Sequence, residues 1–199
     1  MEILILIIGL LISVVFHELA HGITADKLGD DTPRLAGRLT LNPISHLDPI
    51  GSILLPFLSY SLGGFIFGWA KPVPVNPLNL KNPKRDMALV ALMGPITNIA
   101  IALFLLFLLK ISLLINFPVN EMIILSLVRL NIVLAIFNLL PIPPLDGSRL
   151  FLSSLPLSVQ FYLEQIGFFL IIIFIFFGFS IVIKVVNYLM NLLLLIFGI

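Results

Sequence analysis

The chain has 199 residues, of which 60% are hydrophobic and 11% are charged, and its mean hydropathy is +1.19. This composition excludes an ordinary soluble globular protein and predicts a polytopic membrane protein. The net charge of +1 suggests no basic nucleic-acid-binding surface, and the lack of cysteine excludes disulfides, thiolate metal ligands and a cysteine nucleophile.

The first apolar segment, residues 2–22, ends in the motif HELAH at residues 17–21. At roughly 1.5 Å per residue a helix of this length crosses a hydrocarbon core of about 30 Å. Two histidines at this spacing, His17 and His21, lie on one helix face and can bind one metal ion, with Glu18 beside them. The segment has no basic start, and cleavage would remove the motif, so we interpret it as a retained span rather than a signal peptide.

The next apolar segment, residues 49–69, contains Pro56 and the pair Gly63 and Gly64, so it either crosses the membrane or enters it and returns. Seven of the eleven basic residues flank it: Lys27, Arg34, Arg38, Lys71, Lys81, Lys84 and Arg85. Because basic residues collect on the cytoplasmic side, both flanks are expected there, which predicts a re-entrant hairpin. Irregular backbone at that depth must pack against protein or line a wet cavity.

Two polar stretches near the hairpin indicate short strands. Residues 34–42 alternate as RLAGRLTLN, and Pro72 and Pro74 alternate with Val73 and Val75. The second pattern suits an edge strand that pairs on one side only, with a surface loop as the equally weighted alternative. An exposed edge strand holds an extended peptide by β-addition, so residues 69–75 are a candidate substrate clamp.

Further spans are expected at residues 87–109 and 122–140, and residues 161–199 allow two spans, the second crossing the membrane or lying along the interface. The predicted fold is an all-α polytopic bundle of about 4–5 transmembrane helices, with the re-entrant hairpin and short membrane-associated β-strands near the active site. It forms a single domain, residues 1–199, with a core at 1–149 and C-terminal hydrophobic helices at 150–199.

The metal site needs a further ligand, because catalytic zinc usually has three protein ligands and an exchangeable water. With no cysteine, the candidates are His46 and a carboxylate. Asp146 is favoured, since it lies in the stretch NLLPIPPLDG, which breaks the chain at the end of a predicted span. In the alternative interpretation, Asp146 is a helix N-cap. If the first span runs inward, Asp146 and the GPITN stretch reach the same membrane depth as HELAH.

The motifs HELAH, GPITN at residues 94–98 and NLLPIPPLDG at residues 138–147 resemble those of the site-2 protease family of intramembrane zinc metalloproteases. The stretches LNPISHLDPIG and GWAKPVPVNP make the chain most similar to the short prokaryotic members. We expect no control by PDZ or CBS domains within this chain, since its sequence contains neither.

The resemblance implies an enzyme that binds one Zn²⁺ per chain through His17, His21 and Asp146. Water activated by zinc and by Glu18 as general base would attack the scissile carbonyl, and Asn138 would donate its amide to the oxyanion. The substrates would be transmembrane segments of proteins or peptides, cut in regulated intramembrane proteolysis. The implied setting is the cell membrane, with the active site near the cytoplasmic side; the partners are substrate and lipid, not nucleic acid, and no oligomeric state is predicted.

Three other polar residues receive structural interpretations. Asn98 is expected to hydrogen-bond between helices more than to act in catalysis, His46 to order its loop, and Arg129 to pair or snorkel within its span. Two alternative functions stay open: a metal-binding membrane transporter that uses the same ligands, and an inactive protease-like scaffold. The catalytic explanation for Glu18 disfavours the first, and the intact motif disfavours the second.

Overall fold

The structure is a computed structural model that describes residues 2–54, 70–152 and 155–199. The α-helices are α1 (Glu2–Lys27), α2 (Thr32–Leu35), α4 (Pro83–Leu114), α5 (Glu121–Asn138), α6 (Asp146–Leu152), α7 (Leu157–Phe177) and α8 (Phe179–Phe197). Short 3₁₀ turns occupy Pro43–His46 and Pro77–Asn79, and a π-helical turn occupies Pro49–Leu54.

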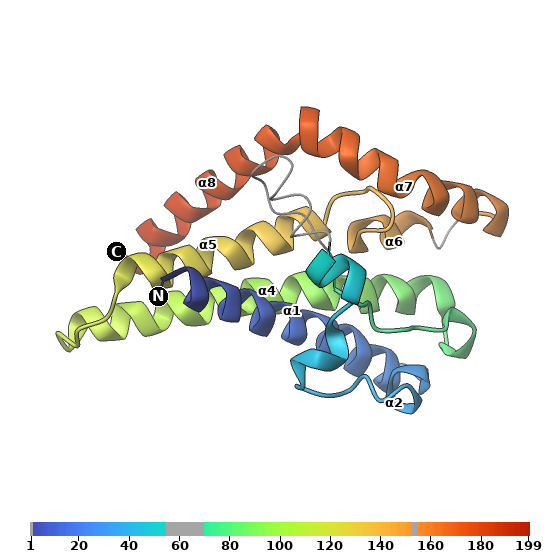
Figure 1. The fold of residues 1–199 in the computed structure, drawn as a ribbon, viewed down its shortest axis with the longest axis horizontal. Coiled ribbons are helices and arrows are strands. Elements are labelled where there is room, and N and C mark those ends of the chain that lie inside the picture. Colours follow the sequence, from blue (N-terminus) through green and yellow to red (C-terminus); the bar gives the residue numbers. More distant parts are fainter. Residues whose placement is uncertain (1, 55–69, 153–154) are drawn as a thin grey trace.

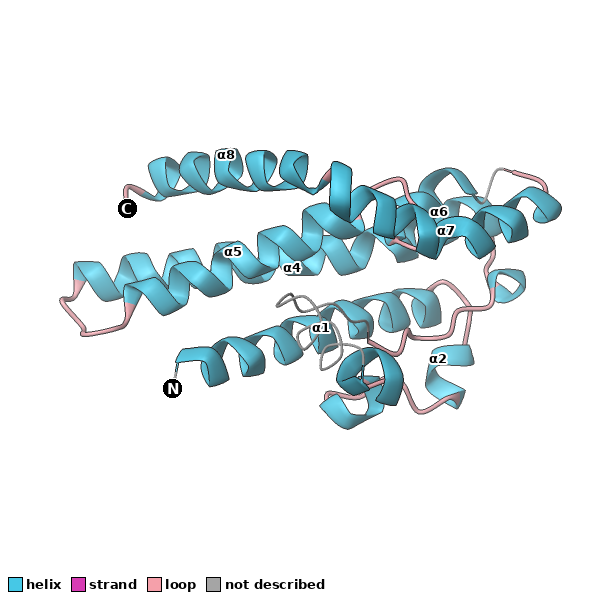
Figure 2. Cartoon of the chain, turned by 45° about the horizontal axis from the view of Figure 1, so that its top comes forward, coloured by secondary structure: helices cyan, strands magenta, loops and turns pink. Residues whose placement is uncertain are grey.

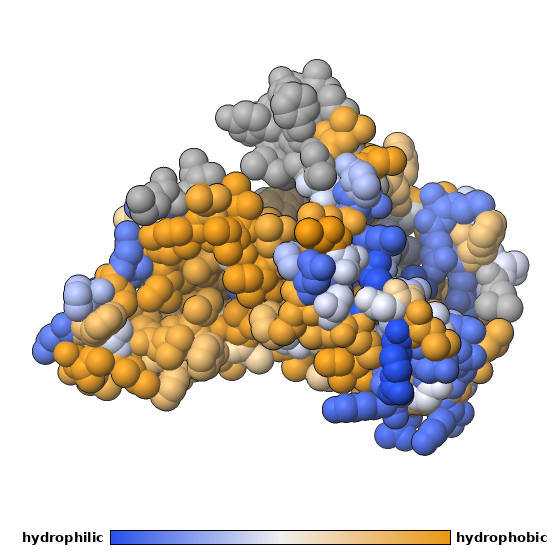
Figure 3. Space-filling model, turned by 60° about the horizontal axis from the view of Figure 1, so that its bottom comes forward, coloured by the Kyte–Doolittle hydropathy of each residue, from blue (hydrophilic) through white to orange (hydrophobic). Residues whose placement is uncertain are grey.

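Five of the described helices are long and apolar enough to cross a membrane: α1, α4, α5, α7 and α8. The chain is therefore an integral membrane protein, as its composition predicts. α1 and α5 run in one direction and α4 returns between them, so the C-terminal end of α1 lies beside the N-terminal half of α4 (Figures 1 and 2). On the face drawn in Figure 3, polar surface gathers most densely at the end of the molecule near α2, and apolar surface covers most of the rest.

Local sequence signals define where the central helices begin. Pro83 stands in the first turn of α4, where the missing N–H is not needed. Asn120 caps α5, because its side chain accepts a hydrogen bond from the Ile123 amide. α5 ends at Asn138, slightly before the predicted end of that span, and the chain then turns into the segment that leads to Asp146.

The buried core joins α4, α5 and α8. It is formed by Ala102, Leu106, Val128, Ile132, Val182 and Val186. α7 and α8 meet at Gly178 with a bend and continue along the molecule in the same direction (Figures 1 and 2). The predicted C-terminal hydrophobic helices are present, and α7 and α8 are each long and apolar enough to cross a membrane.

The predicted β-strands are wrong within the described part of the chain, which contains helices, turns and loops only. Residues 70–76 form a loop. A ladder needs backbone donors, and Pro72 and Pro74 have none. The amides of Lys71 and Val73 are used elsewhere: they donate to the His46 carbonyl and the Glu18 carboxylate.

The predicted re-entrant hairpin at residues 49–69 falls mainly outside the described residues, because only its first residues, 49–54, are described. The loop that follows residue 69 is anchored at its far end by the fully buried Asp30. Asp30 Oδ2 accepts the Asn76 amide at 2.7 Å, and Oδ1 accepts the Asn79 side-chain amide at 3.0 Å. This cluster ties residues 76–79 to the end of α1.

Candidate metal centre

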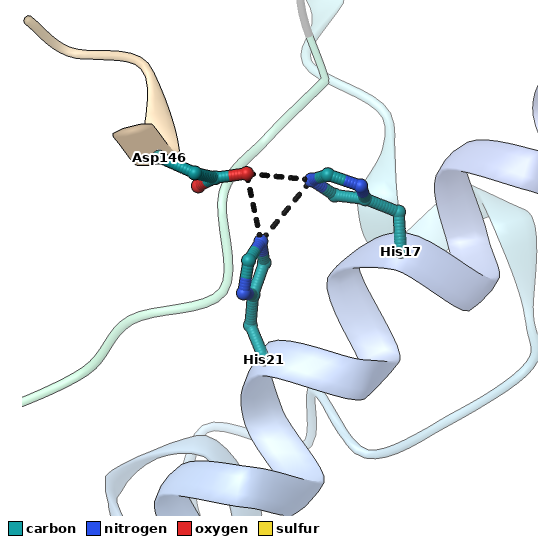
Figure 4. A group of neighbouring side chains, drawn as sticks. All are labelled: His17, His21 and Asp146. Atoms are coloured by element: carbon teal, nitrogen blue, oxygen red, sulfur yellow. Dashed lines mark hydrogen bonds and ion pairs between the residues drawn. The ribbon is translucent and has the colours of Figure 1, made fainter. Parts of the chain in front are cut away.

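Three side chains from two distant parts of the chain meet in the C-terminal half of α1 (Figure 4). His17 and His21 project from one face of α1, as their spacing predicts, and Asp146 is the first residue of α6. His17 Nε2 lies 3.1 Å from His21 Nε2 and 3.1 Å from Asp146 Oδ2. His21 Nε2 lies 3.4 Å from the same Asp146 oxygen. Both imidazoles are buried.

The size of this triangle suits zinc. Zinc–nitrogen and zinc–oxygen bonds of about 2.0–2.2 Å in a tetrahedron separate neighbouring ligand atoms by about 3.3–3.5 Å. The three edges of the triangle, 3.1, 3.1 and 3.4 Å, lie within about 0.2 Å of this range. Asp146 Oδ2 is buried and has no hydrogen-bond partner. A buried carboxylate oxygen without a donor is costly, and a cation at this position would satisfy it.

The hydrogen bonds of the two imidazoles leave both Nε2 atoms free to bind a metal. His21 Nδ1 lies 2.7 Å from the Val90 carbonyl, which only accepts, so Nδ1 carries the proton. His17 Nδ1 lies 2.6 Å from Asn98 Oδ1. In the neutral rings each Nε2 therefore presents a lone pair. Two lone pairs and a carboxylate facing one another form a donor set that favours a cation.

The orientation of Asn98 follows from a chain of buried amides. Asn131 donates Nδ2 to the Leu127 carbonyl at 3.0 Å, so its Oδ1 is an acceptor. Asn98 Nδ2 donates to that Oδ1 at 3.0 Å, which turns Asn98 Oδ1 toward His17. The predicted interhelical role of Asn98 is therefore present, and the same side chain also orients His17, which sequence reasoning missed.

Gly94 provides the space for this centre. A Cβ built at residue 94 would lie 2.6 Å from both Nε2 and Cε1 of His17 and would also collide with His21 Nε2. α4 therefore passes α1 with bare backbone opposite the ligand atoms. This requirement explains the glycine of the GPITN stretch.

Glu18 lies next to the ligands without joining them. Among the described residues, the group that could hold a metal ion consists of His17, His21 and Asp146. Glu18 is half-buried, and its Oε2 accepts the Val73 amide at 2.8 Å. No hydrogen bond to Oε1 is found within the described part of the chain, so this oxygen can accept one from water.

The other predicted residues lie outside the triangle. Asn138 Nδ2 donates to the Leu134 carbonyl at 3.0 Å, which uses one of its two N–H groups. His46 is buried away from the ligand group, and its Nε2 contacts the Thr40 carbonyl at 2.9 Å. Arg129 is exposed and donates to Asn187 Oδ1 on α8 at 2.8 Å, which fits the predicted pairing.

We expect Asn98→Ala to weaken zinc binding about 10- to 100-fold, because loss of a side chain that orients a ligating histidine typically has this effect. Titration of the purified protein with zinc in a competing chelator measures the affinity. Asn187→Ala is the matched control, since it removes an asparagine of α8 bonded to Arg129 instead of a ligand. Equal zinc affinity in Asn98→Ala and the wild type would exclude this role.

Comparison with known proteins agrees with the geometry. A family model described as "Peptidase family M50" matches residues 5–123. A Bacillus subtilis (strain 168) protein named "Putative zinc metalloprotease YwhC" is 42% identical over 167 residues, which are 80% of this chain and 73% of that protein. A Mycobacterium tuberculosis (strain H37Rv) protein named "Putative zinc metalloprotease Rip2" is 35% identical over 144 residues, 71% of this chain and 53% of that protein. No solved structure matches the chain.

Proposed function

Because the chain belongs to peptidase family M50, the site-2 protease family of zinc metalloproteases, we propose that it is an intramembrane endopeptidase that cleaves transmembrane segments of membrane proteins. The observation that carries this proposal is the triangle of His17, His21 and Asp146, with Glu18 beside it, among helices long enough to span a membrane. His17, His21 and Asp146 would hold one Zn²⁺.

The proposed chemistry is peptide hydrolysis by general acid–base catalysis. Zinc, when bound, acts as a Lewis acid that polarises the carbonyl of the substrate and makes water more acidic. Glu18 accepts the proton of the attacking water at Oε1, because Oε2 is occupied by the Val73 amide. Glu18 then gives that proton to the leaving amine nitrogen. Asn98 and the Val90 carbonyl hold the two imidazoles in their metal-binding tautomers throughout.

Asn138 remains a proposed donor to the oxyanion. It stands at the C-terminal end of α5, just before the segment that carries Asp146. One N–H of its amide is bonded to the Leu134 carbonyl, and the other, which has no partner among the residues that the structure describes, is proposed to donate to a substrate oxygen. Loss of such a donor typically costs about 10² to 10³ in rate.

Cleavage and transport can be distinguished with the purified protein in liposomes. A reporter peptide with one transmembrane segment is incubated with the proteoliposomes, and the products are identified by mass spectrometry. Zinc-dependent cleavage within the apolar segment of the peptide supports the protease. Zinc uptake into the vesicles without cleavage would support the transporter instead, and neither activity in a zinc-loaded protein would support the inactive scaffold.

We also propose that the site lies near the cytoplasmic side, since the basic residues before and after residues 49–69 favour that side. Single cysteines placed by Lys27→Cys and Lys81→Cys, in a chain without native cysteine, should then both react only with reagent on the cytoplasmic side. Reaction of the two positions from opposite sides would rule out the re-entrant topology.

A further inference from the structure

The loop at residues 70–76 contacts the proposed general base directly. The Val73 amide donates to Glu18 Oε2 at 2.8 Å. Because Pro72 and Pro74 have no N–H, Val73 supplies the single backbone donor of this three-residue stretch. The Val73 side chain is buried and packs close to Gly22, one turn beyond Glu18 on α1; a Cβ built at Gly22 would lie 3.2 Å from Val73 Cγ1.

A buried arginine holds this loop just before Val73. Arg38 is only 6% exposed. Its Nη2 donates to the carbonyls of Lys71, at 2.5 Å, and Pro72, at 3.3 Å. No carboxylate pairs with Arg38 among the described residues. Burying a cation that has only these carbonyl partners is costly. This cost indicates that Arg38 has a functional role, which is to fix the position of the two carbonyls.

The other contacts fix the two ends of the loop. The Lys71 amide donates to the His46 carbonyl at 2.9 Å, and the Asn76 amide donates to Asp30 at 2.7 Å. Within the described ranges, Arg38 is the side chain that bonds to the peptide units immediately before the Val73 amide. Both bonds come from one nitrogen, Nη2, which carries two N–H groups and lies between the two successive carbonyls.

We propose that Arg38 is a positioning residue for Glu18. By fixing the carbonyls of Lys71 and Pro72, it holds the Val73 amide against Oε2 and so turns Oε1 toward the attacking water. Without this tether the carboxylate loses its fixed orientation, although the metal ligands keep theirs. This inference rests on the proposed protease function, and it assigns residues 70–74 to orientation of the base, a different role from the substrate clamp predicted from the sequence.

Kinetics of Arg38→Met and Arg38→Lys test the proposal. For Arg38→Met we expect kcat for the reporter peptide to fall about 10- to 100-fold, the order of effect of a small misplacement of a catalytic group. KM and bound zinc should stay at the wild-type values. Arg38→Lys, which keeps a positive charge and N–H donors on a differently shaped side chain, should recover part of kcat. Arg34→Met is the matched control, since the exposed Arg34 pairs with Asp26 away from the loop.

A second measurement does not depend on activity. Val73→Cys introduces the single thiol of the chain at a buried position, and its reaction with a maleimide reports how firmly the loop is held. Combined with Arg38→Met, the thiol should react severalfold faster than in the Val73→Cys protein alone. This result would support the tether even if the wild type failed to cleave the reporter, a failure that counts against the proposed function alone.

Three results would overturn the inference. Unchanged kcat and unchanged thiol reactivity in Arg38→Met would show that Arg38 does not hold the loop. Loss of bound zinc in the folded variant would show that Arg38 acts on the metal centre. A rise in KM with unchanged kcat would assign Arg38 to substrate binding. If Arg38→Met does not fold, the same criteria apply to Arg38→Lys.

Discussion

Glu18→Gln should lower the rate of reporter cleavage about 10²- to 10⁴-fold, the usual contribution of a general base. Bound zinc should stay at the wild-type level. Glutamine keeps the size of the side chain and an oxygen that can accept the Val73 amide, but it cannot take a proton from water. Zinc should stay because Glu18 lies outside the group of ligand atoms. Single-turnover cleavage and metal analysis of the same preparation measure both quantities.

The matched control is Glu164→Gln, which makes the same chemical change on α7, where Glu164 pairs with Arg149 at 2.8 Å. Both the zinc content and the cleavage rate of this variant should equal those of the wild type. Wild-type cleavage by Glu18→Gln would reject Glu18 as the base. Loss of zinc from Glu18→Gln would instead make Glu18 a ligand, contrary to its contact with Val73.

The parts of the site that could be predicted depend on residue type and spacing. HELAH at the end of an apolar run places two imidazoles on one face of a spanning helix. Long apolar runs predict the spans. The proposed topology predicts that Asp146, although it lies on a different helix, is level with HELAH in the membrane. The structure joins these residues in one triangle. Periodicity and apolar length are local properties, so the sequence alone reports them well.

The parts that could not be predicted depend on backbone groups and on partners far along the chain. The Val90 carbonyl that orients His21 has no signature in residue type. Asn98 orients His17 only because Asn131 fixes its amide from another helix. The alternation of valine and proline at residues 72–75 suggested a strand, but a strand also needs a partner, and the Val73 amide donates to Glu18 instead.

Gly94→Ala should weaken zinc binding and cleavage together, in contrast to Glu18→Gln. The added methyl group would lie 2.6 Å from His17 Nε2, inside the space that the ligand atoms need. The neighbouring backbone of α4 cannot retreat easily, because α4 packs along α1. We expect zinc affinity to fall by at least the roughly 10- to 100-fold that loss of an orienting side chain causes, as measured by chelator competition.

Because alanine is favoured over glycine in a helix by about 1 kcal/mol, the same substitution should not weaken α4 itself, so a loss of zinc can be separated from unfolding. Gly9→Ala is the control: its methyl group would meet the flexible Leu127 side chain, away from the ligands, and both zinc and activity should persist. Circular dichroism of each variant verifies the helices. If Gly94→Ala binds zinc normally, the ion does not lie between the two Nε2 atoms. Metal binding would then no longer explain why the buried Asp146 Oδ2 has no hydrogen-bond donor.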